Sequence, residues 1–146
     1  MKYALLFVIL VFGTNMYSQK TDISHVPKKI TKILLATDFS KESNFGHVIE
    51  MLLDNDYTIA RDDEKYGTIK TDMRPLKGLN GSYYLNIRTK DNEIIISGQF
   101  VLNIRSHPSM SDIINKGMKG SANNKSFIAM YEFAEKLTFI TKEYDY

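Results

Sequence analysis

The sequence predicts a single α+β domain in which two helices pack on one face of a five-stranded antiparallel sheet. Apolar and polar residues alternate with a period of two between Asp56 and Arg105, which indicates four strands joined by short turns. In addition, apolar residues recur at spacings of three and four in one segment on each side of these strands, as in amphipathic helices. With a first strand before them, the predicted order is β-α-β-β-β-β-α, which leaves one sheet face without a helix.

Residues 1–18 are typical of a secretory signal peptide. Lys2 precedes an apolar run over residues 4–12, and a polar exit follows over residues 13–19. A membrane anchor would need a longer run to form a stable spanning helix. We therefore expect cleavage after Ser18, membrane contact only before that cleavage, and a periplasmic or extracellular destination.

Composition restricts the classes of function. The sequence contains no cysteine, so we expect neither disulfides nor the lipid anchor of a lipoprotein. Removal of residues 1–18 takes one of the 19 basic side chains and none of the 17 acidic ones, which leaves a net charge of +1. Because basic residues form no run longer than Lys28-Lys29, the sequence gives no sign of a nucleic-acid partner.

The elements before the central strands follow from local patterns. Residues 19–29 are polar and aperiodic, so we expect a flexible leader, and the domain itself is predicted to span residues 30–140. Residues 33–36 favour a first strand, and Ser40 can cap a helix that ends near residue 53. The inner face of this helix is expected to carry Phe45, Val48, Ile49, Leu52 and Leu53, and the outer face Lys41, Asn44, Glu50 and Asp54.

The four central strands are predicted over residues 57–61, 68–73, 82–90 and 93–105. An acidic turn that ends at Gly67 joins the first two strands, and the pair Asp91-Asn92 joins the last two. After them, residues 106–124 form an irregular loop in which Ile113 and Ile114 make one helical turn. A last helix over 125–137 and a tail over 141–146 complete the prediction.

The nine residues from Lys32 to Ser40, KILLATDFS, resemble the opening strand and acidic nucleotide-contacting turn of the universal stress protein family. That family has a doubly wound fold, and its ATP-binding members carry a late glycine-rich phosphate loop. Here Gly117 and Gly120 have no matching glycine-serine or glycine-threonine pair, and four consecutive strands break the βα alternation. We interpret this match as coincidental, and keep a nucleotide-binding protein of this type as the least favoured alternative.

Most of residues 30–140 resembles small secreted bacterial domains of unknown function with a TATA-binding-protein-like sheet. The matching features are the helix over 45–53, the pattern of Asp63, Gly67, Ile69 and Thr71, the turn 91–92 with Ile96 and Gly98, and residues 115–121 before an aromatic-containing helix. The resemblance implies a fold and a secreted compartment, and it supplies neither catalytic residues nor a cofactor.

Two groups of residues are candidates for binding. Tyr84 and Arg88 lie on the mixed face of their predicted strand, which is either an open binding surface or a surface covered by a loop or a partner helix. The long loop is the second candidate, because long irregular loops in compact domains are often functional. Its candidate residues are Arg105, His107, Lys116 and Lys119.

Catalytic and metal-binding interpretations find less support. His47 and Glu50 are too few ligands for a metal, and the acidic run 62–64 lacks the alternating ligands of a calcium loop. Ser109, Ser111 and Asp112 lie beside His107 in one loop, from which triad geometry is rarely reached. An enzyme would need distant residues, such as His47, Asp63 and His107, to converge.

The sequence therefore favours a secreted, non-catalytic binding or scaffold module of the cell envelope with a protein partner, without cofactor or metal. The alternative is a small-ligand-binding domain, which would use the space between the open sheet face and the loop 105–124.

Overall fold

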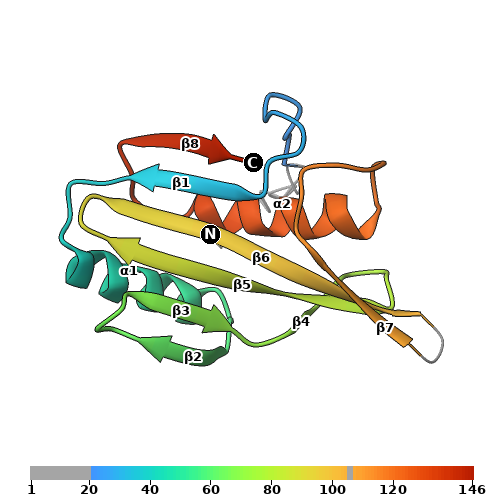
Figure 1. Ribbon diagram of the computed structural model, residues 1–146, viewed down its shortest axis with the longest axis horizontal. Coiled ribbons are helices and arrows are strands. Elements are labelled where there is room, and N and C mark those ends of the chain that lie inside the picture. Colours follow the sequence, from blue (N-terminus) through green and yellow to red (C-terminus); the bar gives the residue numbers. More distant parts are fainter. Residues whose placement is uncertain (1–20, 105–106) are drawn as a thin grey trace, which may run out of the picture.

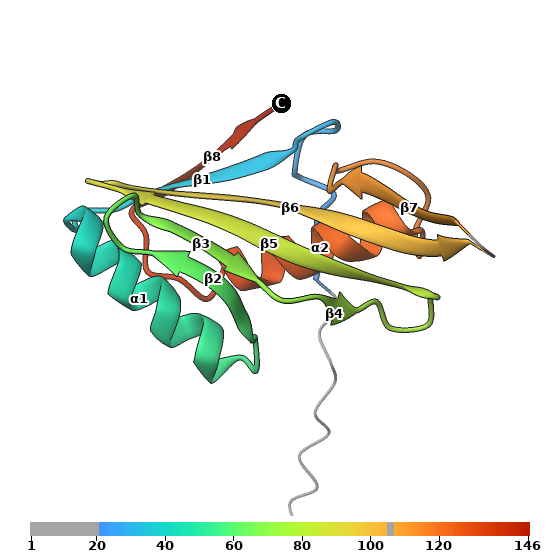
Figure 2. The same cartoon turned by 60° about the horizontal axis from the view of Figure 1, so that its bottom comes forward.

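The computed structural model describes residues 21–104 and 107–146, which form an eight-stranded sheet with two helices against it. Figure 1 looks onto the sheet with the helices behind the strands, and Figure 2 shows both helices along the same face. The predicted α+β class and the two helices are confirmed. The predicted number of strands is wrong, because the sheet contains eight strands and not five.

The elements follow in the order β1 (Lys32–Ala36), α1 (Lys41–Asp54), β2 (Ile59–Asp63), β3 (Thr68–Thr71), β4 (Arg74–Pro75), β5 (Gly81–Lys90), β6 (Glu93–Ile104), β7 (His107–Asp112), α2 (Ala122–Ala134) and β8 (Thr141–Asp145). Neighbouring strands lie in the order β2-β3-β5-β6-β1-β8, while β4 pairs with β5 and β7 with β6. All the pairs that these strands form are antiparallel. The sheet thus lacks the doubly wound architecture that the match at residues 32–40 would imply.

The hairpin of β5 and β6 is the centre of the sheet. It runs from Gly81 opposite Leu102 to Lys90 opposite Glu93. The predicted turn closes it, and Asn92 there adopts a φ of 59°, in the left-handed region that asparagine tolerates better than most residues. The four strands predicted between residues 57 and 105 are therefore present as β2, β3, β5 and β6.

Two of the additional strands lie where the sequence predicts a loop and a tail. β7 pairs with the second half of β6, from Gln99 opposite Asp112 to Ile104 opposite His107. β8 pairs with β1 along its whole length. Ile113, predicted in a helical turn, follows β7 outside any helix and is fully buried.

Both helices begin at a serine that caps the first turn. The Ser40 hydroxyl accepts the Ser43 amide at 3.2 Å, and the Ser121 hydroxyl accepts the Asn124 amide at 3.3 Å. The apolar spacing of the last predicted helix puts Phe127, Met130, Tyr131, Ala134 and Leu137 on one face, and all five are buried. The first helix differs from its prediction at two residues: Asn44 is fully buried and Leu53 is 58% exposed. The Asn44 amide nitrogen offsets the cost of this burial by donating to the Thr37 hydroxyl and to two backbone carbonyls, whereas its Oδ1 has no hydrogen-bond partner.

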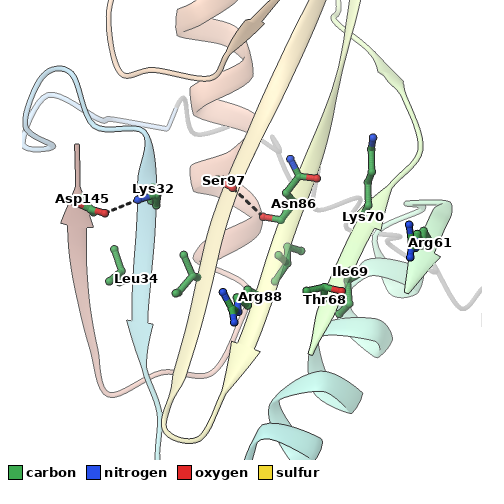
Figure 3. A pocket seen from close by; sticks show the side chains of 12 residues that line it. Lys32, Leu34, Arg61, Thr68, Ile69, Lys70, Asn86, Arg88, Ser97 and Asp145 are labelled. Carbon is green, nitrogen blue, oxygen red and sulfur yellow. Dashed lines mark hydrogen bonds and ion pairs between the residues drawn. The ribbon is translucent and has the colours of Figure 1, made fainter. Parts of the chain in front are cut away.

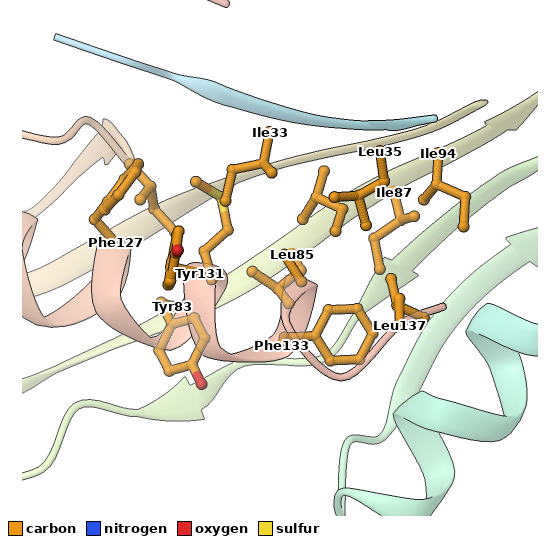
Figure 4. Packing of buried hydrophobic residues seen from close by; sticks show 14 of the residues in the cluster. Ile33, Leu35, Tyr83, Leu85, Ile87, Ile94, Phe127, Tyr131, Phe133 and Leu137 are labelled. Carbon is orange, nitrogen blue, oxygen red and sulfur yellow. The ribbon is translucent and has the colours of Figure 1, made fainter. Parts of the chain in front are cut away.

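The core lies between the helices and one face of the sheet (Figure 4). Strand residues that alternate along β1, β5 and β6 meet the aromatic residues of α2, as the period of two requires. The fully or almost fully buried members that Figure 4 labels are Ile33, Leu35, Leu85, Ile87, Ile94, Phe127, Phe133 and Leu137. The helices leave the opposite face of the sheet uncovered.

The segment before β1 does not behave as the predicted leader. Ile23 and Val26 join the core, with exposures of 9% and 2%. The buried Asn115 amide also donates to the carbonyls of Val26 and Pro27, at 3.1 and 2.8 Å. The described part of the segment, from residue 21, is thus packed against the domain.

Candidate functional site

The uncovered sheet face contains a groove of about 630 Å³ that crosses the strands from β2 to β8 (Figure 3). Most of its lining comes from alternate residues of these strands, whose side chains point away from the helices, and the core residues Ile69 and Ile87 also line it. Arg61 lies at one end of the groove, the pair of Lys32 and Asp145 lies at the other, and Arg88 lies between them. The groove is the candidate site.

A polar row runs straight across the sheet and forms one side of the groove. Arg61 lies opposite Lys70, Lys70 opposite Asn86, and Asn86 opposite Ser97. Lys32 and Ser97 each lie one residue beyond the pair Ile33–Ile96, so the row continues onto β1. We call this set the polar row.

The second row contains the apolar floor of the groove. Thr68 lies opposite Arg88, Arg88 opposite Ile95, and Ile95 opposite Leu34. Leu34 and Ile95 are half-buried, so their side chains offer apolar surface to a bound molecule. We call this set the mixed row.

A bulge in β2 turns Arg61 toward the groove. Ile59 lies opposite Thr71, but Arg61 lies opposite Lys70, so the register shifts between them. The extra residue lets Ile59 pack against the core while Arg61 points to the other face. Strict alternation from Ile59 would have put both side chains on one face, as the sequence predicts.

Three cations on the β2, β3 and β5 part of the groove are exposed, and none has a carboxylate partner within the described residues. They are Arg61, Lys70 and Arg88. The Lys70 ammonium lies 4.2 Å from the centre of the Tyr84 ring, a cation–π contact that holds it over β5. This part of the groove therefore carries three cations, with the Asp63 carboxylate opposite Thr68 on the same face.

The β8 end of the groove has a different electrostatic character. Lys32 forms an ion pair of 2.7 Å with Asp145, and this hydrogen bond lowers the pKa of the Asp145 carboxyl group. Glu143 adds a carboxylate opposite Leu34. The groove thus changes from positive charge at β2 and β3, through an apolar centre, to a neutral or negative end at β8.

The predicted binding residues are divided between separate places. Arg88 lines the groove as expected for an open face. Tyr84 shares that face, but its side chain is only 6% exposed, because Lys70 covers its ring and its hydroxyl hydrogen-bonds to Gln99. Tyr84 is therefore buried on that face and does not line the groove. Of the two alternatives for its ring, exposed or covered, the ring is covered, although by Lys70 and not by a loop or a partner helix.

The other predicted residues lie away from the groove or outside the described chain. His107 begins β7 and is exposed, at the far end of the molecule from α1 (Figure 1). Lys116 and Lys119 are exposed on the connection to α2, and Lys119 lies beside the N-terminal segment in a separate hollow. Arg105 lies outside the described residues. The space predicted between the open face and this connection is therefore not the groove.

The chemistry of the groove is suited to binding. His47 lies on the helix side, where it accepts a hydrogen bond from the Thr138 amide. His107 begins β7, at the other end of the molecule (Figure 1). His47, Asp63 and His107 therefore do not meet in one cleft, as an enzyme of the kind considered above would require. Within residues 21–104 and 107–146, no group of three acidic or histidine side chains could hold a metal ion. Cations beside an apolar floor can instead hold an anionic group attached to an apolar one.

Sequence reasoning missed Arg61, Lys70 and Lys32 as site residues. The alternation predicts Lys70 and Arg88 on the faces opposite the core, so aligning the mixed faces of the predicted strands would have found these two together. The bulge at β2 and the pairing of β1 with β6 leave no comparable sequence signal.

No protein-family model matches the chain, and no curated protein matches it. The resemblance to secreted domains with a TATA-binding-protein-like sheet therefore stays a prediction. In the part of the chain that the structure describes, no helix is long and apolar enough to cross a bilayer.

Proposed function

We propose that this protein is a secreted, non-catalytic binding or scaffold module that holds a protein partner on the uncovered face of its sheet. The observation that carries the proposal is the groove on a face that no helix covers, lined by the exposed cations Arg61, Lys70 and Arg88. These exposed cations have no carboxylate partner among the described residues, so an anionic partner would gain from pairing with them.

The shape of the groove favours a protein over a small molecule. Small-ligand sites enclose most of the ligand and are lined mainly by apolar and aromatic side chains. This groove lies open along the sheet, and none of its lining residues is aromatic. A partner that extends across several strands would cover it more completely.

The test is capture of partners from the cell envelope by the tagged wild-type protein, by Arg88→Glu and by Lys119→Glu. Both variants reverse one exposed charge, but only Arg88 lies in the groove. We expect a stoichiometric protein partner that wild type and Lys119→Glu retain and Arg88→Glu loses. Equal capture by all three proteins would contradict the proposed face.

A small-ligand-binding domain is the second candidate, favoured by the groove volume of about 630 Å³. Pockets for small molecules typically measure about 300–1,000 Å³. A thermal-shift screen distinguishes the two functions: a small anionic molecule that stabilises wild type and not Arg88→Glu, with no protein partner captured, would favour this candidate.

A further inference from the structure

The charge gradient along the groove identifies the kind of segment that the partner presents. We infer that it is an extended segment with two acidic residues and one apolar residue at alternate positions, written acidic-x-acidic-x-apolar, which crosses the strands from the β2 end toward β8. This inference rests on the proposed function and adds the chemistry of the partner.

The spacing of the sheet fixes the spacing of the residues. Adjacent strands lie about 4.8 Å apart, and alternate residues of an extended chain lie about 6.6 Å apart on the same side. Arg88 belongs to the mixed row, whereas Lys70 and Arg61 belong to the polar row, two residues further along the strands. A segment that crosses the sheet obliquely therefore places one acidic side chain beside Arg88 on β5 and its next same-side neighbour toward Arg61 on β2. Two acidic residues at alternate positions then match Arg88 and Arg61, while the Lys70 ammonium lies over the Tyr84 ring.

In the other direction, the next same-side position falls over the apolar floor. From Arg88 the mixed row continues to Ile95 on β6 and Leu34 on β1, and the aliphatic side chains of both residues are half-buried. An apolar side chain there removes their exposed surface from water. A polar side chain at this position would lose its hydration without a partner beneath it.

Charge at the β8 end sets the direction of the segment. Glu143 lies opposite Leu34, and the Asp145 carboxylate is already paired with Lys32. An acidic residue placed beyond the apolar one would meet these carboxylates and be repelled, whereas one over β3 would meet cations. The two acidic positions of the segment therefore lie at the β2 end.

The test uses the purified protein and the capped peptide Ser-Asp-Thr-Asp-Thr-Leu-Ser, followed by two-dimensional NMR of the ¹⁵N-labelled protein. Matched control peptides replace both aspartates by asparagine, or the leucine by serine. We expect shifts at Arg61, Lys70, Arg88, Ile95 and Leu34, and at least about a tenfold higher Kd for the asparagine peptide. The double variant Lys70→Glu/Arg88→Glu should raise the Kd of the acidic peptide by a similar factor, whereas Lys116→Glu should leave this Kd unchanged.

Three results would overturn the inference: equal binding of the asparagine peptide, shifts confined to the region of Lys116 and Lys119, or a free dicarboxylate that binds as tightly as the peptide. Failure here differs from failure of the proposed function. If Arg88→Glu loses the envelope partner but the acidic peptide binds no better than its controls, the face binds a partner of other chemistry. If capture survives Arg88→Glu, the proposed face itself is wrong.

Discussion

At the residue scale, the buried phenol groups of Tyr57 and Tyr83 should make the stability of the protein decrease at alkaline pH. Their hydroxyl groups are joined by a hydrogen bond of 3.0 Å, beneath the Arg74 guanidinium, which lies 4.3 Å from the Tyr57 ring. Burial, followed by the neighbouring Tyr57, raises the pKa of Tyr83 far above its usual range. Tyr83 therefore stays protonated in the folded state where the unfolded chain ionises.

We predict that Tyr83→Phe lowers the free energy of unfolding by about 1 kcal/mol at pH 7, the net value of a buried hydrogen bond. Because the folded pKa is raised, the contribution of Tyr83 is complete below the unfolded pKa of about 10 and decreases as the pH rises above it. The free energy of unfolding of the variant does not decrease in this way. Above about pH 10 the wild type loses about 1.4 kcal/mol of unfolding free energy per pH unit, so the two proteins should become equally stable at about pH 11.

Urea unfolding of both proteins between pH 7 and pH 11 measures this difference. Tyr66→Phe is the control, because Tyr66 is 64% exposed and should change stability little at any pH. A gap between wild type and Tyr83→Phe that stays constant up to pH 11 would contradict the assigned cause.

Two glycines allow a matched prediction about packing. A Cβ at Gly98 would lie 2.5 Å from the Tyr84 carbonyl oxygen and 2.8 Å from Ile113 Cδ1, whereas one at Gly46 in α1 would meet nothing within 4 Å. We predict that Gly98→Ala destabilises the protein by about 1–3 kcal/mol through overpacking. Gly46→Ala should instead stabilise it by about 0.5–1 kcal/mol, because alanine favours a helix. Thermal and urea unfolding measure both effects. If both substitutions changed the free energy of unfolding in the same direction, the close approach at Gly98 would be absent.

At the scale of elements, the sequence predicts what is buried on one face. The helices and the strands β1, β3, β5 and β6 carry apolar residues at the period of their structure, and the sequence predicts all of them. β2 was predicted too, but its bulge breaks the predicted alternation after Ile59. β7 gives no such signal, because every one of its residues is exposed and its sequence, HPSMSD, reads as a loop. Its pairing with β6 fixes its conformation without contributing to the core.

The sequence of β8 also predicts its strand poorly, although it gives a weak alternating pattern. Its residues alternate between exposed and half-buried, with Lys142 and Tyr144 toward the core side opposite Leu35 and Ile33. Five polar or aromatic residues at the end of a chain are too short a pattern to distinguish an edge strand from a tail. The strand is held instead by the ladder with β1, and by Lys142, which pairs with Glu135 and donates to the Tyr131 hydroxyl at 2.8 Å.

At the scale of the whole molecule, the groove depends on pairing that local sequence does not encode. Arg88 was identified because its strand has a clear mixed face. Arg61, Lys70 and Lys32 join it only through the bulge in β2 and the registers of β3 with β5 and β1 with β6. A one-residue slip in any of these registers would turn the side chains of that strand to the opposite face. The groove is therefore a property of the assembled sheet.

The last prediction concerns where the mature chain begins. Ile23 and Val26 belong to the core, and Val26 and Pro27 accept hydrogen bonds from the Asn115 amide. Cleavage after Ser18 would leave all these contacts intact. We therefore predict that the precursor yields a mature protein that begins at Gln19, measured by mass spectrometry of the envelope or extracellular fraction.

A chain that begins at Lys28 should be less stable than one that begins at Gln19 by about 3 kcal/mol or more. It loses two buried apolar side chains, each worth about 1.5–3 kcal/mol when fully buried, and leaves the Asn115 amide without its acceptors. The combined variant Ile23→Ala/Val26→Ala in the longer chain keeps both backbone acceptors, so its smaller loss separates the apolar contribution from that of the hydrogen bonds. Equal urea midpoints for the chains that begin at residues 19 and 28 would instead mean that the segment before β1 is a flexible leader, as its composition alone suggests.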